Sequence, residues 1–198
     1  MLVPRSPSPA AAAFTPPAMA LSTTDLAAAN ALLGSGRDQV RTLVQTAAAQ
    51  DGSLQRFVSI FGSGAAISAT SRRLATTLQG YATGQVPLPA VELVGSDTLG
   101  NRAGAWSSST NRLLVNAEWL LALPAADRVW SLQWVILNAL GSSLEMNLRF
   151  GLGTSSAGIR LANGLLGVQG TQPASVGTIT VQVGTSSLTA FAINANQV

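Results

Sequence analysis

The chain contains no cysteine, no histidine and no lysine. Without cysteine it forms no disulfide, no thiolate metal site and no cysteine nucleophile. Without histidine it lacks the commonest metal ligand and general base. Its eight carboxylates are scattered along 198 residues. These absences predict that the chain is not a metal-, histidine- or cysteine-dependent enzyme, and that it holds no cofactor. They leave the compartment open, because cytoplasm and export both accommodate a cysteine-free chain.

Charge is also scarce, since charged residues make up 10% of the chain and apolar residues 47%. Globular proteins average about 25% charged residues, and disordered chains combine high charge with low hydrophobicity. We therefore expect most of the chain to fold. The cations are all arginines and are spread along the sequence, with Arg72 and Arg73 the one adjacent pair. A nucleic-acid partner is not expected, because nucleic-acid binding requires clustered basic residues.

Long hydrophobic runs are missing as well. The most apolar stretch, 129–141, is interrupted by Ser131, Gln133 and Asn138, and it is shorter than the roughly 20 residues that a bilayer requires. No membrane span is expected. A surface with so few charges is poorly protected against association, which favours a protein partner or self-association.

Residues 1–21 hold five of the nine prolines, with alanine and serine between them. Because proline interrupts helices and strand ladders, we predict a disordered leader there. A cleaved signal peptide is the alternative, with Arg5 before the apolar run 10–14 and a cleavage-like Ala18–Ala20.

Residues 22–198 are predicted to form a single α+β domain. Its helical part, 22–82, should begin at the capping residues Ser22–Asp25, break at Gly34–Gly36 and resume over 37–50. Apolar stripes predict two further helices, one around 54–61 and one over 65–81.

The mixed part, 90–170, is expected to contain a small antiparallel sheet around a buried central helix. The segments 91–94, 104–106 and 113–115 are predicted strands. Helices are expected over 116–123, 125–150 and 157–166, the second after Pro124, which suits a first helical turn. Alternation over 178–193 predicts a C-terminal β-hairpin within 176–194.

The predicted helix 125–150 is apolar around most of its circumference, which indicates burial. Its polar residues lie at helical spacing along one stripe: Ser131, Asn138, Ser142, Glu145 and Arg149. Such a stripe faces either water or a cleft. If it faces water, Glu145 and Arg149 form an i,i+4 pair that contributes a few tenths of a kcal/mol.

Four segments carry a resemblance to a known domain: Gly104–Trp106, Thr110–Val115, Asn116–Glu118 and Val135–Ser142. They resemble a domain of large secreted bacterial proteins that often bear hemolysin-type calcium-binding repeats elsewhere. In that domain a hairpin precedes a helix reading Leu-Leu-Glu-Glu-Ile-Gly-His-x-x-Asp. A Gly-Asp-Glu-Gly segment and a final hairpin follow. The helix is in turn similar to the His-Glu-x-Gly-His helix of zincin metalloproteases. The order and spacing fit from about residue 40 to 195, and imply a secreted or cell-surface protein.

The residues that would carry the chemistry of this resemblance are replaced. Asn138 stands at the first ligand position, Ala139 at the general-base position and Ser142 at the second ligand position, while Gly141 is kept. Glu145 falls near the trailing Asp of the family. The acidic segment corresponds to Gly153–Ser156, which has no acid. Zinc needs three or four imidazole, thiolate or carboxylate ligands, and a hydrolytic site needs a base beside its water. The resemblance therefore implies the scaffold without the metal site.

Other constellations were weighed in the same way. The four tryptophans Trp106, Trp119, Trp130 and Trp134 are interpreted as core; the alternative is an aromatic binding platform, with Trp106 and Trp119 as candidate binding residues. Ser107–Thr110 is interpreted as a polar hairpin turn, because a serine nucleophile would lack a base. A glycosidase-type carboxylate pair would have to come from Glu92, Asp97, Glu118, Asp127 or Glu145, and their spacing brings no two together.

Three hypotheses about function follow. The first is a non-catalytic binding or assembly module, a pseudoenzyme-like relative of the secreted metalloprotease-like domain. The second is a weak hydrolase or metal binder that uses Glu145 with Glu118. The third is a lineage-specific protein of no defined biochemical activity.

Overall fold

The structure, a computed structural model, describes residues 21–61, 65–149, 154–168 and 177–198. Of the predicted leader, residues 1–20 lie outside the described residues, as does Gly153 of the segment aligned with the acidic motif.

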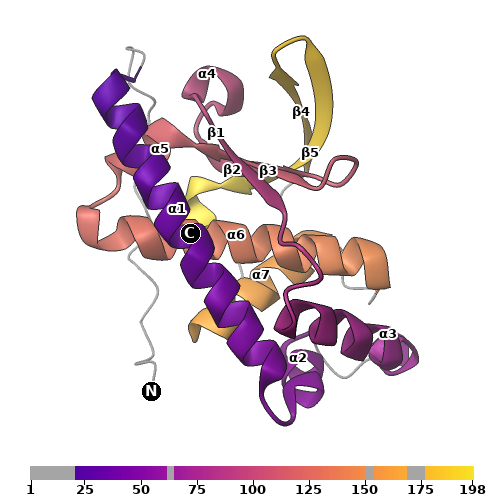
Figure 1. The fold of residues 1–198 in the computed structure, drawn as a ribbon. Coiled ribbons are helices and arrows are strands. Elements are labelled where there is room, and N and C mark those ends of the chain that lie inside the picture. Colours follow the sequence, from indigo (N-terminus) through magenta and orange to yellow (C-terminus); the bar gives the residue numbers. More distant parts are fainter. Residues whose placement is uncertain (1–20, 62–64, 150–153, 169–176) are drawn as a thin grey trace.

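Helices and strands occupy most of the described chain (Figure 1). The helices are α1 (Thr23–Ala49), α2 (Ser53–Phe61), α3 (Ala65–Ala82), α4 (Ser96–Leu99), α5 (Ala117–Ala122), α6 (Ala125–Leu148) and α7 (Thr154–Leu166). The strands are β1 (Ala90–Val94), β2 (Arg102–Ser107), β3 (Arg112–Asn116), β4 (Thr178–Val183) and β5 (Ser186–Asn194), with the 3-10 helix η1 (Ala195–Gln197) after them. The α+β class predicted from the sequence is confirmed.

The five strands form one sheet in the order β1-β3-β2-β5-β4. β2 pairs antiparallel with β3 and β5, and β4 pairs antiparallel with β5, so both predicted hairpins are confirmed. The expectation of a wholly antiparallel sheet was wrong at one pair, because β1 runs parallel to β3. The chain reverses direction twice between these strands, through α4 and through the β2–β3 turn, so β3 returns in the direction of β1.

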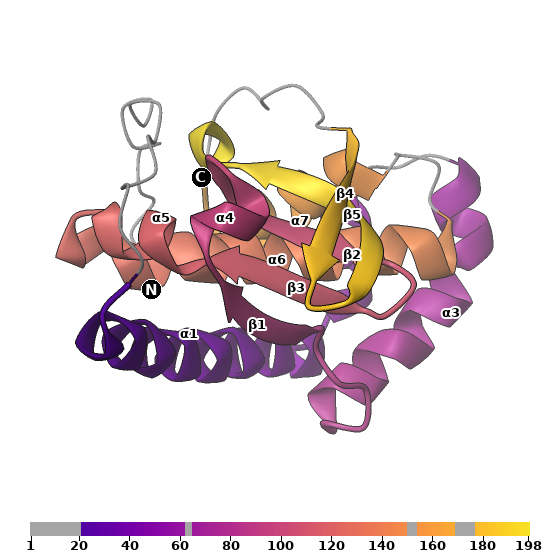
Figure 2. The same cartoon turned by 90° about the horizontal axis from the view of Figure 1, so that it is seen from above.

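The helix α6 runs beneath the sheet, with α7 beside it and α1 crossing it (Figures 1 and 2). Alternation along β3 separates the two faces of the sheet. Leu113 and Val115 join the large core on α6, while Leu114 joins a small cluster under α4 and β4. The large core contains residues of α1, α2, α3, α5, α6 and α7 together with the sheet.

The helix α1 is continuous, so the predicted break at Gly34–Gly36 was wrong. The buried stripe Ala29, Leu33, Gly36, Val40 and Val44 passes through this segment at spacings of three and four residues. Gly36 lies where α1 meets α6, and a Cβ there would come 2.6 Å from Leu132 Cδ2. The glycine therefore permits a close helix crossing, and the burial along α1 outweighs its low helix propensity.

The remaining predicted elements are confirmed with small shifts of their ends. The predicted helix 157–166 begins earlier, at Thr154, and the central helix ends at Leu148. No helix in the described part of the chain combines the length and hydropathy needed to cross a membrane.

Candidate functional site

The site that the sequence singles out is the polar stripe of α6. This helix follows Pro124 and ends at Arg149, which adopts a left-handed conformation (φ 56°) and donates its main-chain N–H to Glu145 O. A glycine would be more usual at such a position.

The stripe is buried, so it does not face water. Ser131 is 4% exposed, Asn138 5%, Ser142 2% and Glu145 8%. Of the two alternatives left open by the sequence, the one in which the stripe faces water was therefore wrong for these four residues. The physical reason is that α7 covers this side of α6. Of the five, Arg149 is exposed.

Two glycines set the contact between α6 and α7. A Cβ on Gly158 of α7 would lie 2.5 Å from Asn138 O, 2.6 Å from Asn138 Oδ1 and 2.7 Å from Ser142 Oγ. A Cβ on Gly141 of α6 would lie 2.6 Å from Ala157 O. The side chains of Asn138 and Ser142 thus lie against the backbone of α7. Ala139, between them on α6, is fully buried.

The same two helices are joined by a hydrogen bond. Trp134 Nε1 donates to Asn163 Oδ1 over 2.8 Å, and Trp134 is 1% exposed. On the far side of α7, Arg160 Nη1 donates to Phe61 O at the end of α2. The Trp134 indole and the Arg160 Nη1 thus each gain a hydrogen-bond acceptor on a neighbouring helix.

The carboxylates proposed for a weak hydrolase lie apart. Glu118 stands at the start of α5, which precedes the first turn of α6, whereas Glu145 lies near the end of α6. Twenty residues of helix separate Ala125 from Glu145, a rise of about 30 Å, and Figure 1 shows α5 at the opposite end of α6 from its C-terminus. The structure does not bring Glu118 and Glu145 together.

Glu118 instead belongs to a structural polar cluster at the end of β3. Its Oε2 accepts from the main-chain N–H of Ser96 over 2.9 Å, which holds the start of α4. Fully buried Asn116 caps α5 by accepting from Trp119 N, accepts from Ser96 Oγ, and donates to the carbonyls of Gly100 and Arg102. Both the oxygen and the nitrogen of this amide are hydrogen-bonded. Their bonds hold the loop between β1 and β2, and the start of α5, against the sheet.

The other acidic residues show no metal-binding arrangement. Glu92 forms an ion pair with Arg112 across β1 and β3. Within the described residues, no group of three or more His, Cys, Asp or Glu is placed to hold a metal ion. Burial raises the pKa of the Tyr81 phenol well above its usual range.

Trp106, Trp119 and Trp134 lie in the core, as interpreted from the sequence, while Trp130 is partly buried and packs against that core. Trp106 and Trp119 are each 2% exposed, so the alternative of a surface platform built on these two residues was wrong. The Trp106 ring stacks on Phe191 with centroids 5.7 Å apart, and its Nε1 donates to Asn111 Oδ1.

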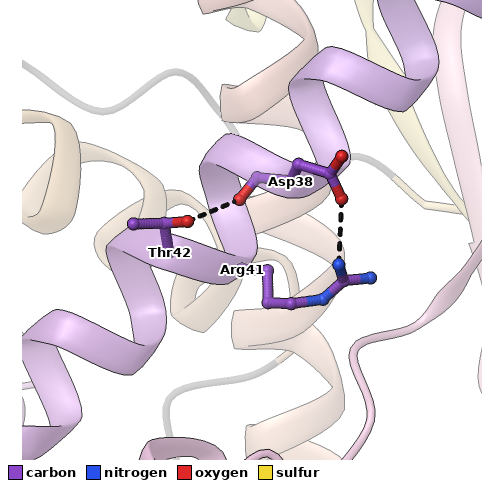
Figure 3. A network of polar contacts seen from close by, with 3 residues as sticks. All are labelled: Asp38, Arg41 and Thr42. Carbon is purple, nitrogen blue, oxygen red and sulfur yellow. Dashed lines mark hydrogen bonds and ion pairs between the residues drawn. The ribbon is translucent and has the colours of Figure 1, made fainter.

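One surface groove escaped sequence reasoning. It has a volume of about 480 Å³ and is lined by Asp38, Gln39, Thr42, Leu43 and Thr46 of α1, Gln133 of α6 and Leu166 of α7. At its edge Arg41 Nη1 bonds Asp38 Oδ1 at 2.9 Å and Thr42 Oγ1 donates to Asp38 O (Figure 3). Gln133 Nε2 bridges to Gln39 Oε1 over 2.6 Å. Because the lining comes from three helices far apart in sequence, no local motif predicts it.

Comparison with models of protein families, with curated proteins and with solved structures finds no match to this chain.

Proposed function

We propose that the chain is a non-catalytic binding or assembly module, built on a scaffold like that of the secreted metalloprotease-like domain, with the metal site lost. The observation that carries this proposal is the close packing of α7, through Gly158, on Asn138 and Ser142. In a zincin-like arrangement these two positions would hold the metal.

Two chemical requirements of a hydrolytic zinc site bear on the proposal. Such a site needs three protein ligands and an open coordination position for water, with a general base nearby. Asn138, Ala139 and Ser142 supply neither a strong ligand nor a base. The backbone of Ala157 and Gly158 occupies the side of α6 where a substrate would have to approach.

Two features of the surface, its low charge and a groove, support the binding part of the proposal. A chain with 10% charged residues has little electrostatic protection against association. A largely apolar groove, with Leu43 and Leu166 among polar side chains in its lining, lies across three helices, and linings of this kind are common at binding sites.

Metal addition tests the non-catalytic part. We expect the thermal unfolding midpoint of the purified full chain to be the same with excess Zn²⁺ and with a chelator. A site occupied at 100 times its Kd would instead add about 2.7 kcal/mol of stability. We also expect no cleavage of a denatured protein substrate under either condition.

The matched control for this experiment is Glu145→Gln, which removes the one carboxylate of the stripe. Substrate cleavage that a chelator abolishes, and that this variant loses, would refute the proposal and favour a hydrolase.

A further inference from the structure

Two groups of like charge lie at opposite ends of the helix α6, while other charges pair along the middle of the molecule, such as Arg41 with Asp38 and Arg112 with Glu92. Four exposed arginines lie on α2, on α3, which packs against α2, and at the end of α6: Arg56, Arg72, Arg73 and Arg149. Arg73 Nη2 donates to Asn147 O over 3.0 Å, which places α3 against the end of α6. Asp51 is the exposed acid on the described elements here. We call these four arginines the basic end.

Acidic residues gather at the opposite end of α6, where α1, α4, α5 and α6 begin (Figure 1). They are Asp25, Asp97, Glu118 and Asp127, and we call them the acidic end. Two arginines nearby, Arg102 and Arg128, are half-buried and donate to main-chain carbonyls of Leu99, Leu121 and Leu123. Their cations are directed at the protein's own backbone.

Each end also carries an exposed large hydrophobic side chain. Within the described residues, the large hydrophobics that are exposed are Leu26 and Met146, each at 45%. Leu26 follows Asp25 in the first turn of α1, and Met146 lies three residues before Arg149 in the last turn of α6. Protein interfaces usually have an apolar core that is surrounded by a polar rim.

We propose that the protein associates head to tail with a second copy of itself, the basic end of one molecule docking on the acidic end of the next. This inference rests on the proposed assembly function and names the partner. The two surfaces differ, so the contact is heterologous, and each molecule keeps one end of each sign available for a further copy. Complementary charge sets the orientation and speeds association, while Leu26 and Met146 supply apolar burial.

Sedimentation of the purified full chain tests this proposal. We expect the average mass to rise with protein concentration at low salt and to fall towards that of one chain at about 0.5 M salt, where the screening length is only a few Å. A chain that stays monomeric at every concentration in low salt would overturn the inference. It would leave the proposed function standing, because that proposal is tested by metal and cleavage.

Charge reversals sharpen the test. Arg72→Glu reverses one charge of the basic end and Asp97→Arg reverses one charge of the acidic end, and both side chains are exposed. We expect each variant to associate about tenfold more weakly, a change equivalent to about 1.4 kcal/mol. Arg37→Glu, on an exposed position in the middle of α1, makes the same change in net charge and is expected to associate like the native chain.

Mixing the two reversed variants gives the most specific result. The intact acidic end of Arg72→Glu can bind the intact basic end of Asp97→Arg, whereas any further copy would have to use a reversed end, which binds about tenfold more weakly. We therefore expect a 1:1 complex with twice the mass of the chain to predominate over larger species. If the mixture stays monomeric, or if Arg37→Glu weakens association as much as Arg72→Glu, the head-to-tail assignment is wrong.

Discussion

The Gly158→Ala variant is expected to unfold with a free energy about 3 kcal/mol lower than the native chain, an overpacking effect at the upper end of the usual range. The new methyl group would meet the carbonyl oxygen of Asn138 at 2.5 Å and Ser142 Oγ at 2.7 Å. Because the nearest atom belongs to a backbone, a rotamer change cannot relieve the clash. The helices α6 and α7 would have to separate.

Gly34→Ala is the matched control, because it makes the same substitution inside a helix. A Cβ at position 34 of α1 would have nothing within 4 Å. Alanine is favoured over glycine in a helix by roughly 0.5–1 kcal/mol, so this variant is expected to be more stable than the native chain. Urea denaturation followed by circular dichroism measures both values. Equal stabilisation by the two substitutions would show that α6 and α7 do not approach as described.

The second large effect is expected from Trp106→Ala, which should lower the free energy of unfolding by about 4 kcal/mol. The indole is 2% exposed, stacks on Phe191 and bonds Asn111. Its removal would leave a cavity between β2 and β5 and remove the hydrogen bond to the β2–β3 turn. A cavity of that size is only partly closed by relaxation of its neighbours.

Trp130→Ala provides the comparison for this core position, because Trp130 is only half-buried. Its truncation should lower the midpoint of urea unfolding much less. A Trp106→Ala chain that unfolds at the native midpoint would show that this indole does not pack in the core as described.

Much of the secondary structure could be predicted because local signals were strong. Alternation over residues 178–193 and the run 113–115 gave the positions of β3, β4 and β5, and Pro124 marked the start of α6. The break expected at Gly34–Gly36 failed because glycine has low helix propensity, while its use in this fold is to let Leu132 of α6 approach α1. That contact is tertiary, and periodicity on one helix does not reveal it.

The candidate site, too, could be predicted from the sequence only where local signals were sufficient. The polar stripe of α6 was visible from spacing alone. Its burial was not, because it depends on a glycine of another helix, Gly158, meeting these side chains. The groove on α1 and the segregated charges were also invisible, since Arg72, Arg73 and Arg149 become neighbours only when α3 packs on the end of α6.

The central claim is that α7 closes the face of α6 on which a metal site would lie, and thiol accessibility tests it most directly. Because the native chain has no cysteine, single-cysteine variants report on one position each. Ser142→Cys places a thiol on the closed face, and Asn147→Cys places one on an exposed position of the same helix. Native circular dichroism and thermal unfolding of both variants establish that they fold.

We expect the thiol of Ser142→Cys to react with an aqueous disulfide reagent on the order of 100-fold more slowly than that of Asn147→Cys, because it reacts only when the helices open. Denaturant should make the two rates equal. If the folded Ser142→Cys variant reacts as fast as Asn147→Cys, the face of α6 is open to solvent, and the account of a closed, non-catalytic scaffold is contradicted.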